Sequence, residues 1–287
     1  GRSPSFRSRF LGTHFFNPPR YLKLLEIIPT PQTDTAVTDF MVKFGRDVLG
    51  KGVVVCKDTP NFIGNRFFAV AASYGIEYAM QNSYTVAEID AITGPTIGRP
   101  KTATFRLMDL VGLDVMGHVN HNLYEAVPHD PYRDILKPEK TAAVMGQMIE
   151  NKWLGNKTGQ GFYKQAFVDG KRVFLTLNPE TMDYFDGGSP RFDSVGKVRK
   201  VEDLGERVRK LLEFDDRAAN YLRDLLYYGF AYAAHVAPEI AYKLSDVDDA
   251  MRWGFAHEAG PFEMWDMLGV AETAVKMEAA SLEVAGW

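Results

Sequence analysis

A helical pattern that occurs twice constrains this chain more than any other feature of its sequence. The segment EIDAITGPTIGRPKTATFRLMDLVGLD, residues 88–114, is similar to DVDDAMRWGFAHEAGPFEMWDMLGVAE, residues 246–272, with one residue of insertion between the two registers. Upstream of each, SYGIEYA at 73–79 is similar to YYGFAYA at 227–233. Similarity of this length indicates two copies of one supersecondary unit. The matched positions include Phe105 with Phe262, Asp109 with Asp266, and Gly112 with Gly269.

Residues 10–56 have a different character and are not repeated. Residues 10–16 and 21–28 are apolar, aromatic and bounded by Pro-rich turns, as strands are, and the apolar run 52–56 is short enough for a buried strand. Between them, apolar residues recur at helical spacing over 34–49. A strand, helix, strand order with little charge on the strands is typical of an α/β sheet, of which only a piece is present.

Composition excludes several classes of protein. The net charge is −4 and both signs are interspersed, whereas a nucleic-acid-binding protein should show a basic patch. The single cysteine, Cys56, rules out a disulfide framework and is typical of a reducing compartment, so we expect a cytoplasmic protein. No apolar run approaches the roughly 20 residues that a membrane-spanning helix needs.

The stretch GTHFFNPPRYLKLLEIIPT, residues 12–30, can bring a histidine and a glutamate together. We assume the hairpin register in which Phe16 lies opposite Leu24. This register also places His14 opposite Glu26, on one face, with β-carbons about 5 Å apart. The carboxylate can then accept from one ring nitrogen and leave the other for a substrate, which is the arrangement of a general acid and base. A purely structural His–Glu pair has the same spacing, so the pattern alone leaves both readings open.

Three ordered blocks closely resemble the L-3-hydroxyacyl-CoA dehydrogenase family. The blocks are THFFNPPRYLKLLEIIPT, VVVCKDTPNFIGNR and GNKTGQGFYK, and the resemblance covers essentially the whole chain. It implies NAD-dependent oxidation of L-3-hydroxyacyl-CoA to 3-oxoacyl-CoA in fatty acid β-oxidation. A related hydroxy-acid or crystallin-like dehydrogenase is the alternative within the enzyme class. A non-catalytic helical module for domain assembly or dimer-like packing is the alternative outside it.

The resemblance also implies roles for individual residues. His14 corresponds to the catalytic acid and base, Glu26 to the residue that orients it, and Asn65 to a residue beside the substrate. Asn17 resembles a residue that touches the nicotinamide end of NAD, and Lys157 resembles another cofactor contact. The implied substrate is an acyl-CoA that loses a hydride from carbon 3 to NAD while His14 takes the hydroxyl proton.

The resemblance sets the expected fold class and domains. We expect a mainly α fold, in which two repeated helical modules are preceded by the α/β tail of a truncated Rossmann domain. The family's G-x-G-x-x-G nucleotide motif is not found in these 287 residues, so we expect this chain alone to be inactive and to bind NAD poorly. The expected divisions are a tail at 1–58, a first module at 59–164, a linker that could hold one hairpin at 165–195, and a second, degenerate module at 196–287.

The tandem copy implies partners as well. Single-module members of the family pair their helical domains as dimers, and a second copy could supply the same interface within one chain. Large multifunctional β-oxidation proteins are built in this way and often carry an enoyl-CoA hydratase, which makes a fused or partner hydratase a further expectation. The second copy is interpreted as structural, because its counterpart of NFIGNR, at 217–224, keeps an asparagine but not the pattern.

Three further features have weaker functional interpretations. His118 and His121 form an H-x-x-H pattern, but no carboxylate or cysteine of suitable spacing joins them, so we predict no metal site. Cys56 ends a buried strand and should be inert. An aromatic and methionine cluster could line an acyl site, although packing is its more usual use; it comprises Met251, Trp253, Phe255, Phe262, Met264, Trp265 and Met267.

Overall fold

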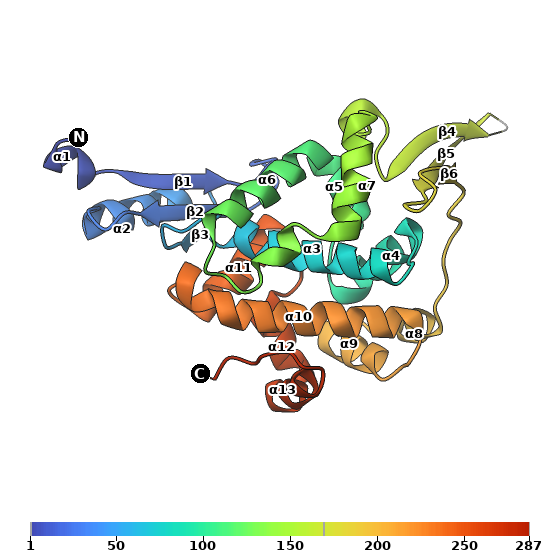
Figure 1. Cartoon of the computed structure of the whole chain (residues 1–287). Coiled ribbons are helices and arrows are strands. Elements are labelled where there is room, and N and C mark those ends of the chain that lie inside the picture. Colours follow the sequence, from blue (N-terminus) through green and yellow to red (C-terminus); the bar gives the residue numbers. More distant parts are fainter. Residues whose placement is uncertain (1, 169, 287) are drawn as a thin grey trace. The chain divides into compact units, whose positions relative to one another are not determined.

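Two compact units make up the chain in the computed structural model (Figure 1), which describes residues 2–168 and 170–286. Unit 1 combines Gly1–Phe68 with Gly229–Trp287, and unit 2 is Ala69–Tyr228. The division falls inside two long helices, α3 (Gly64–Gln81) and α10 (Arg217–Ile240). Unit 1 is therefore assembled from the two ends of the sequence.

Unit 1 contains a three-stranded sheet in the order β1–β2–β3. β1 pairs antiparallel with β2, and β2 pairs parallel with β3 through a crossover that contains α2 and the π-helical turn η1. Apart from Glu26 in β2, the strands β2 and β3 are apolar, as strands are when helices cover both faces of a sheet. The elements are α1 (Pro4–Arg7), β1 (Leu11–Phe15), β2 (Leu24–Pro29), α2 (Thr35–Lys43), η1 (Phe44–Val48) and β3 (Gly52–Val55).

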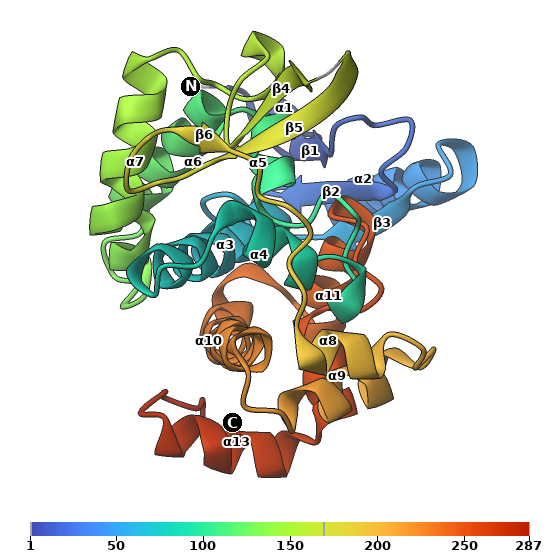
Figure 2. The ribbon, with the colours of Figure 1, turned by 90° about the vertical axis from the view of Figure 1, so that its right-hand side faces the viewer.

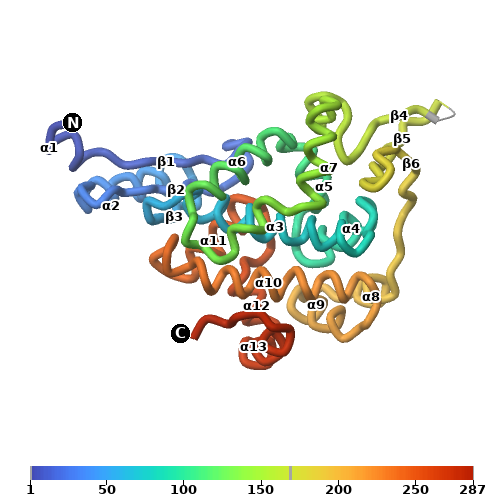
Figure 3. Tube along the Cα trace, in the orientation of Figure 1, coloured from blue at the N-terminus to red at the C-terminus, as the bar shows by residue number. Residues whose placement is uncertain are grey.

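One face of this sheet is covered by α2, where Leu25, Ile27 and Val53 form a buried cluster with Leu11, Met41 and Val42 packed against it. The other covering helix comes from the far end of the sequence. It is α11 (Leu244–Gly254), which contacts both β2 and β3 (Figures 2 and 3).

The contact of α11 with the sheet is close enough to require a glycine. A β-carbon on Gly52 would lie 2.3 Å from the ring of Trp253, which no side chain tolerates. The carbonyl of Trp253 also accepts a hydrogen bond from the backbone N–H of Lys23, at 3.1 Å. Unit 1 is completed by α12 (Pro261–Leu268) and α13 (Val270–Ala279).

Unit 2 surrounds the rest of α3 and α10 with shorter helices and a second three-stranded sheet, in the order β4–β5–β6. Both pairings in this sheet are antiparallel. The elements are α4 (Val86–Ile92), η2 (Pro95–Ile97), α5 (Phe105–Val111), α6 (Leu113–Ala126), η3 (Arg133–Leu136), α7 (Glu139–Glu150), η4 (Asn156–Thr158), β4 (Tyr163–Val168), β5 (Lys171–Leu177), β6 (Tyr184–Phe185), α8 (Asp193–Val198) and α9 (Leu204–Leu212).

The predicted repeat has a common structural basis, in which an aspartate on one helix caps the next helix. In unit 2, Asp90 on α4 accepts from the backbone N–H of Phe105 at 2.7 Å, at the start of α5. In unit 1, Asp248 on α11 accepts from the N–H of Phe262 at 2.8 Å, in the first turn of α12. A carboxylate at this position satisfies N–H groups that have no partner within their own helix.

The repeat also shares the way in which its second helix ends. Gly112 follows α5 with φ 101°, and Gly269 follows α12 with φ 86°. Both values lie in the region that glycine adopts without steric cost, and in both copies the next helix begins at the following residue. The pattern α4–α5–α6 therefore recurs as α11–α12–α13.

The two helices that carry SYGIEYA and YYGFAYA are α3 and α10, and in unit 2 they contact each other. Tyr74 and Tyr228, which occupy equivalent positions of the repeat, stack with ring centroids 3.6 Å apart. The Tyr221 hydroxyl donates to the carbonyl of Gly75 at 3.1 Å. Glycine is suited to this position because a β-carbon there would lie 2.9 Å from that hydroxyl.

Equivalent positions of the two helices also contact each other in unit 1. The repeat alignment makes Phe67 equivalent to Tyr221, and Tyr232 equivalent to Tyr78. In unit 2 the rings of Tyr78 and Tyr221 lie 5.8 Å apart, and in unit 1 the rings of Phe67 and Tyr232 lie 6.2 Å apart. Such reciprocity is what a self-complementary contact between two copies produces.

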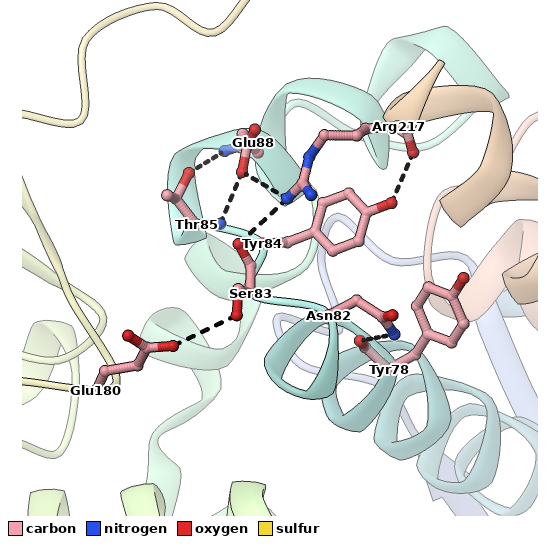
Figure 4. Close-up of polar contacts among 8 residues, drawn as sticks. All are labelled: Tyr78, Asn82, Ser83, Tyr84, Thr85, Glu88, Glu180 and Arg217. Atoms are coloured by element: carbon pink, nitrogen blue, oxygen red, sulfur yellow. Dashed lines mark hydrogen bonds and ion pairs between the residues drawn. The ribbon is translucent and has the colours of Figure 1, made fainter. Parts of the chain in front are cut away.

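The turn after α3 is tied to the start of α10 (Figure 4). Thr85 and Glu88 form a capping box at α4, with hydrogen bonds of 3.2 and 2.8 Å. Arg217, the first residue of α10, lies 3.5 Å from the Glu88 carboxylate and donates to the Ser83 carbonyl at 3.1 Å. Its own carbonyl accepts from the Tyr84 hydroxyl at 2.8 Å.

The predicted fold class is wrong. The chain is not an α/β tail followed by two mainly α modules, because each compact unit combines helices with a three-stranded sheet. The second copy packs α11 against β2 and β3 and shares unit 1 with them, so it does not form a unit by itself. Strands β5 and β6 and most of β4 lie in the segment 165–195, which was expected to be a linker that could hold one hairpin. The predicted domain boundaries stay predictions, and the compact units divide elsewhere.

Asp109 shows how the two copies have diverged. Its buried carboxylate, 1% exposed, accepts from the N–H groups of Phe162 and Tyr163, each at 2.8 Å, and so holds the Gly-rich loop 154–164. A β-carbon on Gly161 would overlap Asp109 Oδ1. The equivalent Asp266 is exposed. The same residue is therefore structural in one copy only.

This divergence predicts unequal effects of one substitution. Asp109→Ala should lower the free energy of unfolding by about 2 kcal/mol, because it leaves two buried N–H groups without a partner. Asp266→Ala, the matched control, should change it by less than about 0.5 kcal/mol. Urea unfolding of both variants measures the difference, and equal effects would contradict the assignment.

Asp109 also leads to a pH prediction. Burial raises the pKa of Asp109 to about 6, although the N–H donors of Tyr163 and Phe162 oppose the shift. In the unfolded chain the group has a pKa of about 3.9. The stabilisation from the bound proton is therefore complete below about pH 4 and is lost as the pH rises through about 6. The stability of the chain minus that of Asp109→Asn should fall over this window in urea titrations, and a constant difference would refute the shift.

Candidate functional site

The hairpin of β1 and β2 brings His14 and Glu26 together. The two residues are direct partners in the strand register, which confirms the register assumed from the sequence. His14 Nδ1 donates to Glu26 Oε2 at 2.6 Å. The His14 side chain is 29% exposed while that of Glu26 is completely buried. The imidazole can therefore present Nε2 outwards while Nδ1 faces the carboxylate.

The other oxygen of Glu26 binds the start of α3. Oε1 accepts from the backbone N–H of Ile63 at 3.1 Å and from that of Gly64 at 2.9 Å. A helix N-terminus favours a negative charge, and these two donors together with His14 satisfy a carboxylate that no water reaches. Glu26 thus fixes the hairpin to α3 and holds its own position from two sides.

The turn before α3 has an unusual backbone. Asn61 and Phe62 both have positive φ, 62° and 53°, although neither is glycine. Asparagine tolerates this region, whereas it is costly for a phenylalanine. The turn directs the N–H groups of Ile63 and Gly64 at Glu26, and it places the Phe62 ring 5.6 Å from the ring of His14.

Asn65 lies in the first turn of α3, one residue after the N–H group that binds Glu26, and its side chain is half-buried. Asn17 is exposed just beyond the strand that carries His14, and its bond to Pro18 is cis. In the part of the chain that the structure describes, neither side-chain amide makes a hydrogen bond. Four of the five predicted site residues therefore lie in unit 1.

Lys157, the fifth predicted site residue, lies in unit 2. It forms an ion pair with Asp114, at the first turn of α6. The Asp114 carboxylate therefore gives the Lys157 ammonium a partner of opposite charge within the chain, so no cofactor is needed to balance its charge. Its predicted role as a cofactor contact stays a prediction.

Sequence reasoning missed two aromatic neighbours of His14. The Phe16 ring, two residues further along the chain, lies 4.8 Å from the imidazole, and the Phe62 ring lies 5.6 Å from it. The two-residue spacing of Phe16 from His14 was the available signal. Cys56 is completely buried, and burial, followed by the nearby charge of Glu26, raises the pKa of its thiol far above the ordinary value. Its inertness stays a prediction.

The histidines of the H-x-x-H pattern do not form a ligand set with their neighbours. His118 Nδ1 donates to the carbonyl of Asp114 at 2.7 Å. Among residues 2–168 and 170–286 there is no group of three or more His, Cys, Asp or Glu side chains that could hold a metal ion. Within the same residues, no helix has the length and apolar character needed to cross a membrane.

Two models of one family match the chain in succession. The model described as 3-hydroxyacyl-CoA dehydrogenase, NAD binding domain, matches residues 3–59, and 3-hydroxyacyl-CoA dehydrogenase, C-terminal domain, matches residues 62–165. The first match also contradicts the predicted fold class, because residues 3–59 correspond to an NAD-binding domain and not merely to the tail of one. The match gives no support to the expectation, drawn from the missing G-x-G-x-x-G motif, that the chain binds NAD poorly.

Individual relatives agree with the family models. A probable 3-hydroxyacyl-CoA dehydrogenase of Bacillus subtilis is 42% identical over 287 residues, which are 100% of this chain and 35% of that protein. A putative fatty acid oxidation complex trifunctional enzyme of Rickettsia felis is 31% identical over 261 residues, 91% of this chain and 34% of that protein. The chain thus spans about a third of the length of each of these relatives.

A solved structure supports the fold. The crystal structure of 3-hydroxybutyryl-CoA dehydrogenase from Escherichia coli K12 aligns with a TM-score of 0.60 at 18% identity, covering 96% of this chain and 67% of that one. At this identity the likeness shows the fold alone. Because the two domain models follow one another over residues 3–165 and the Bacillus subtilis relative, 42% identical over the whole chain, carries the name of the same family, the chain belongs to the 3-hydroxyacyl-CoA dehydrogenase family.

Proposed function

We propose that the protein to which this chain belongs oxidises L-3-hydroxyacyl-CoA to 3-oxoacyl-CoA with NAD, as a step of fatty acid β-oxidation. The observation that carries the proposal is the hydrogen bond from His14 Nδ1 to the buried Glu26, with Nε2 left for a substrate. A family with dehydrogenase activity in its name supports the reaction class.

His14 acts as the base in this proposal. Oxidation removes a hydride from carbon 3 and a proton from the hydroxyl on that carbon, so that the C–O bond becomes a carbonyl. His14 Nε2 takes the proton, and in the reverse direction it returns it. Such a group typically changes the rate by about 10²–10⁴-fold.

Glu26 prepares His14 for this role. Its carboxylate fixes the Nδ1–H tautomer, and it stabilises the imidazolium that forms when Nε2 takes the proton. Ile63 and Gly64 hold the other carboxylate oxygen, so Glu26 does not have to reorient during the reaction. A site held in place in this way needs little rearrangement as charge develops.

The residues near His14 fit a dinucleotide and a thioester. Asn17 and Asn65 each carry an amide with no partner in the described chain, which suits the carboxamide of a nicotinamide and the oxygen atoms of a hydroxyacyl thioester. Bound NAD would supply the hydride acceptor. Asn17 and Lys157 are proposed to contact the cofactor, and Asn65 the acyl-CoA.

Two further roles belong to the whole protein. The reciprocal contacts of α3 and α10 favour the pairing of the two helical copies within one chain as its second, assembly function. A hydratase, fused or separate, would supply the hydroxyacyl substrate, and a relative named as a trifunctional enzyme supports this.

The single, buried Cys56 supports a reducing compartment, for which we propose the cytoplasm.

Substitution of the pair tests the proposed reaction. In the whole protein, His14→Gln should lower kcat by about 10²–10⁴-fold with little change in KM, because proton transfer acts in the transition state. Glu26→Gln should lower kcat less, because an amide in place of the carboxylate stabilises the imidazolium less well. Absorbance of NADH during oxidation of 3-hydroxybutyryl-CoA measures both.

A histidine away from the pair provides the control. His118→Gln alters an exposed residue on α6 and should leave turnover unchanged. If His14→Gln and Glu26→Gln both kept near-normal turnover, the assignment of His14 as base would be wrong.

A further inference from the structure

The end of α11 lies beside the strand that carries His14. Gly254, the last residue of α11, faces Phe16: a β-carbon there would lie 3.2 Å from two atoms of the Phe16 ring. The next residue, Phe255, meets the same ring edge-on at 5.4 Å. The second helical copy, interpreted from sequence as structural, therefore reaches the surroundings of the pair.

Phe16 is held from a second side by α3. A β-carbon on Gly64 would lie 2.8 Å from Phe16 Cζ and 3.5 Å from Phe255 Cε2. Phe255 also stacks on Phe68 of α3 at 4.3 Å, with the planes 18° apart. Two glycines and one phenylalanine thus enclose the Phe16 ring, which is 7% exposed.

Phe16 in turn contacts His14. The ring centroids are 4.8 Å apart at an interplanar angle of 57°. Since His14 and Phe16 are two residues apart in extended backbone, their side chains point to the same side of the hairpin. Because the Phe16 ring is enclosed by its neighbours, it limits the orientations that the His14 imidazole can adopt beside it.

We propose that Phe255 is a positioning residue for His14, acting through Phe16. The proposal rests on the proposed function, in which Nε2 of His14 must meet the hydroxyl of the substrate. Phe255 itself touches neither the imidazole nor the carboxylate in any contact found among the described residues. Its role is to keep Phe16 packed, so that His14 keeps its geometry towards Glu26.

Loss of the ring should loosen this arrangement. Phe255→Ala leaves a space beside Phe16, whose ring can then move away from His14. A displacement of about 1 Å in a catalytic group can cost about 100-fold in rate. We therefore expect kcat to fall by about 10- to 100-fold with a much smaller change in KM. Phe255→Tyr keeps the ring at a half-buried position and should restore most of the turnover.

A second aromatic pair in unit 1 provides a matched control. Phe230 and Trp265 stack at 5.4 Å with planes 4° apart, and both are buried. No ring contact joins either of them to Phe16 in the described residues. Phe230→Leu should therefore lower stability without altering His14.

The decisive measurement is the ring tautomer of His14, read by NMR in chain labelled at histidine, with its signal assigned by its loss in His14→Gln. In Phe255→Ala a larger share of neutral His14 should carry its proton on Nε2, because an imidazole that is less well placed donates less well from Nδ1 to Glu26. In Phe230→Leu and Phe255→Tyr the tautomer should stay as in the wild-type chain. Circular dichroism shows whether each variant is folded, and Phe255→Leu replaces Phe255→Ala if the latter is not.

The outcomes separate the two proposals. A weaker preference for the Nδ1–H tautomer together with reduced kcat supports the positioning role. An unchanged tautomer and an unchanged kcat in folded Phe255→Ala overturn it and leave the proposed function standing. If the wild-type protein oxidises no hydroxyacyl-CoA, the proposed function fails, and the tautomer measurement still decides whether Phe255 positions His14.

Discussion

The structure around the candidate site depends on one buried carboxylate. Glu26 has no exposed surface, and it is bound by the imidazole of His14 on one oxygen and by the N–H groups of Ile63 and Gly64 on the other. Removal of any of these donors would leave part of a buried charge unsatisfied, which is costly. The hairpin, the strained turn at 61–62 and the start of α3 are therefore kept together by the same group that orients the imidazole.

Much of this local arrangement could be predicted because it follows from strand geometry. The two-residue period of strands and a hairpin turn determine which residues face each other, so placing Phe16 opposite Leu24 was enough to pair His14 with Glu26. The repeat was likewise visible, because capping aspartates and positive-φ glycines leave residue types that can be recognised. Asp90 and Asp248 cap the following helix, and Gly112 and Gly269 end it.

The fold class could not be predicted in the same way. The contact of α11 with β2 and β3 joins residues that lie about two hundred positions apart, and the apolar face of α11 does not reveal which surface it covers. Gly52 is required by that contact, but in the sequence it was interpreted only as the first residue of the strand at 52–56. The contact between Phe16 and Phe255 was missed for the same reason, since it exists only once the second copy packs on the sheet.

The role of His14 as the base depends on its ring tautomer, which long-range ¹H–¹⁵N correlation spectra of the histidine ring report directly. If Nδ1 donates to Glu26, neutral His14 should carry its proton on Nδ1 and leave Nε2 unprotonated. In Glu26→Gln this preference should be lost, while His118 should be unaffected. A neutral His14 that carries its proton on Nε2 in the wild-type chain would contradict the account, because no base would then face the substrate.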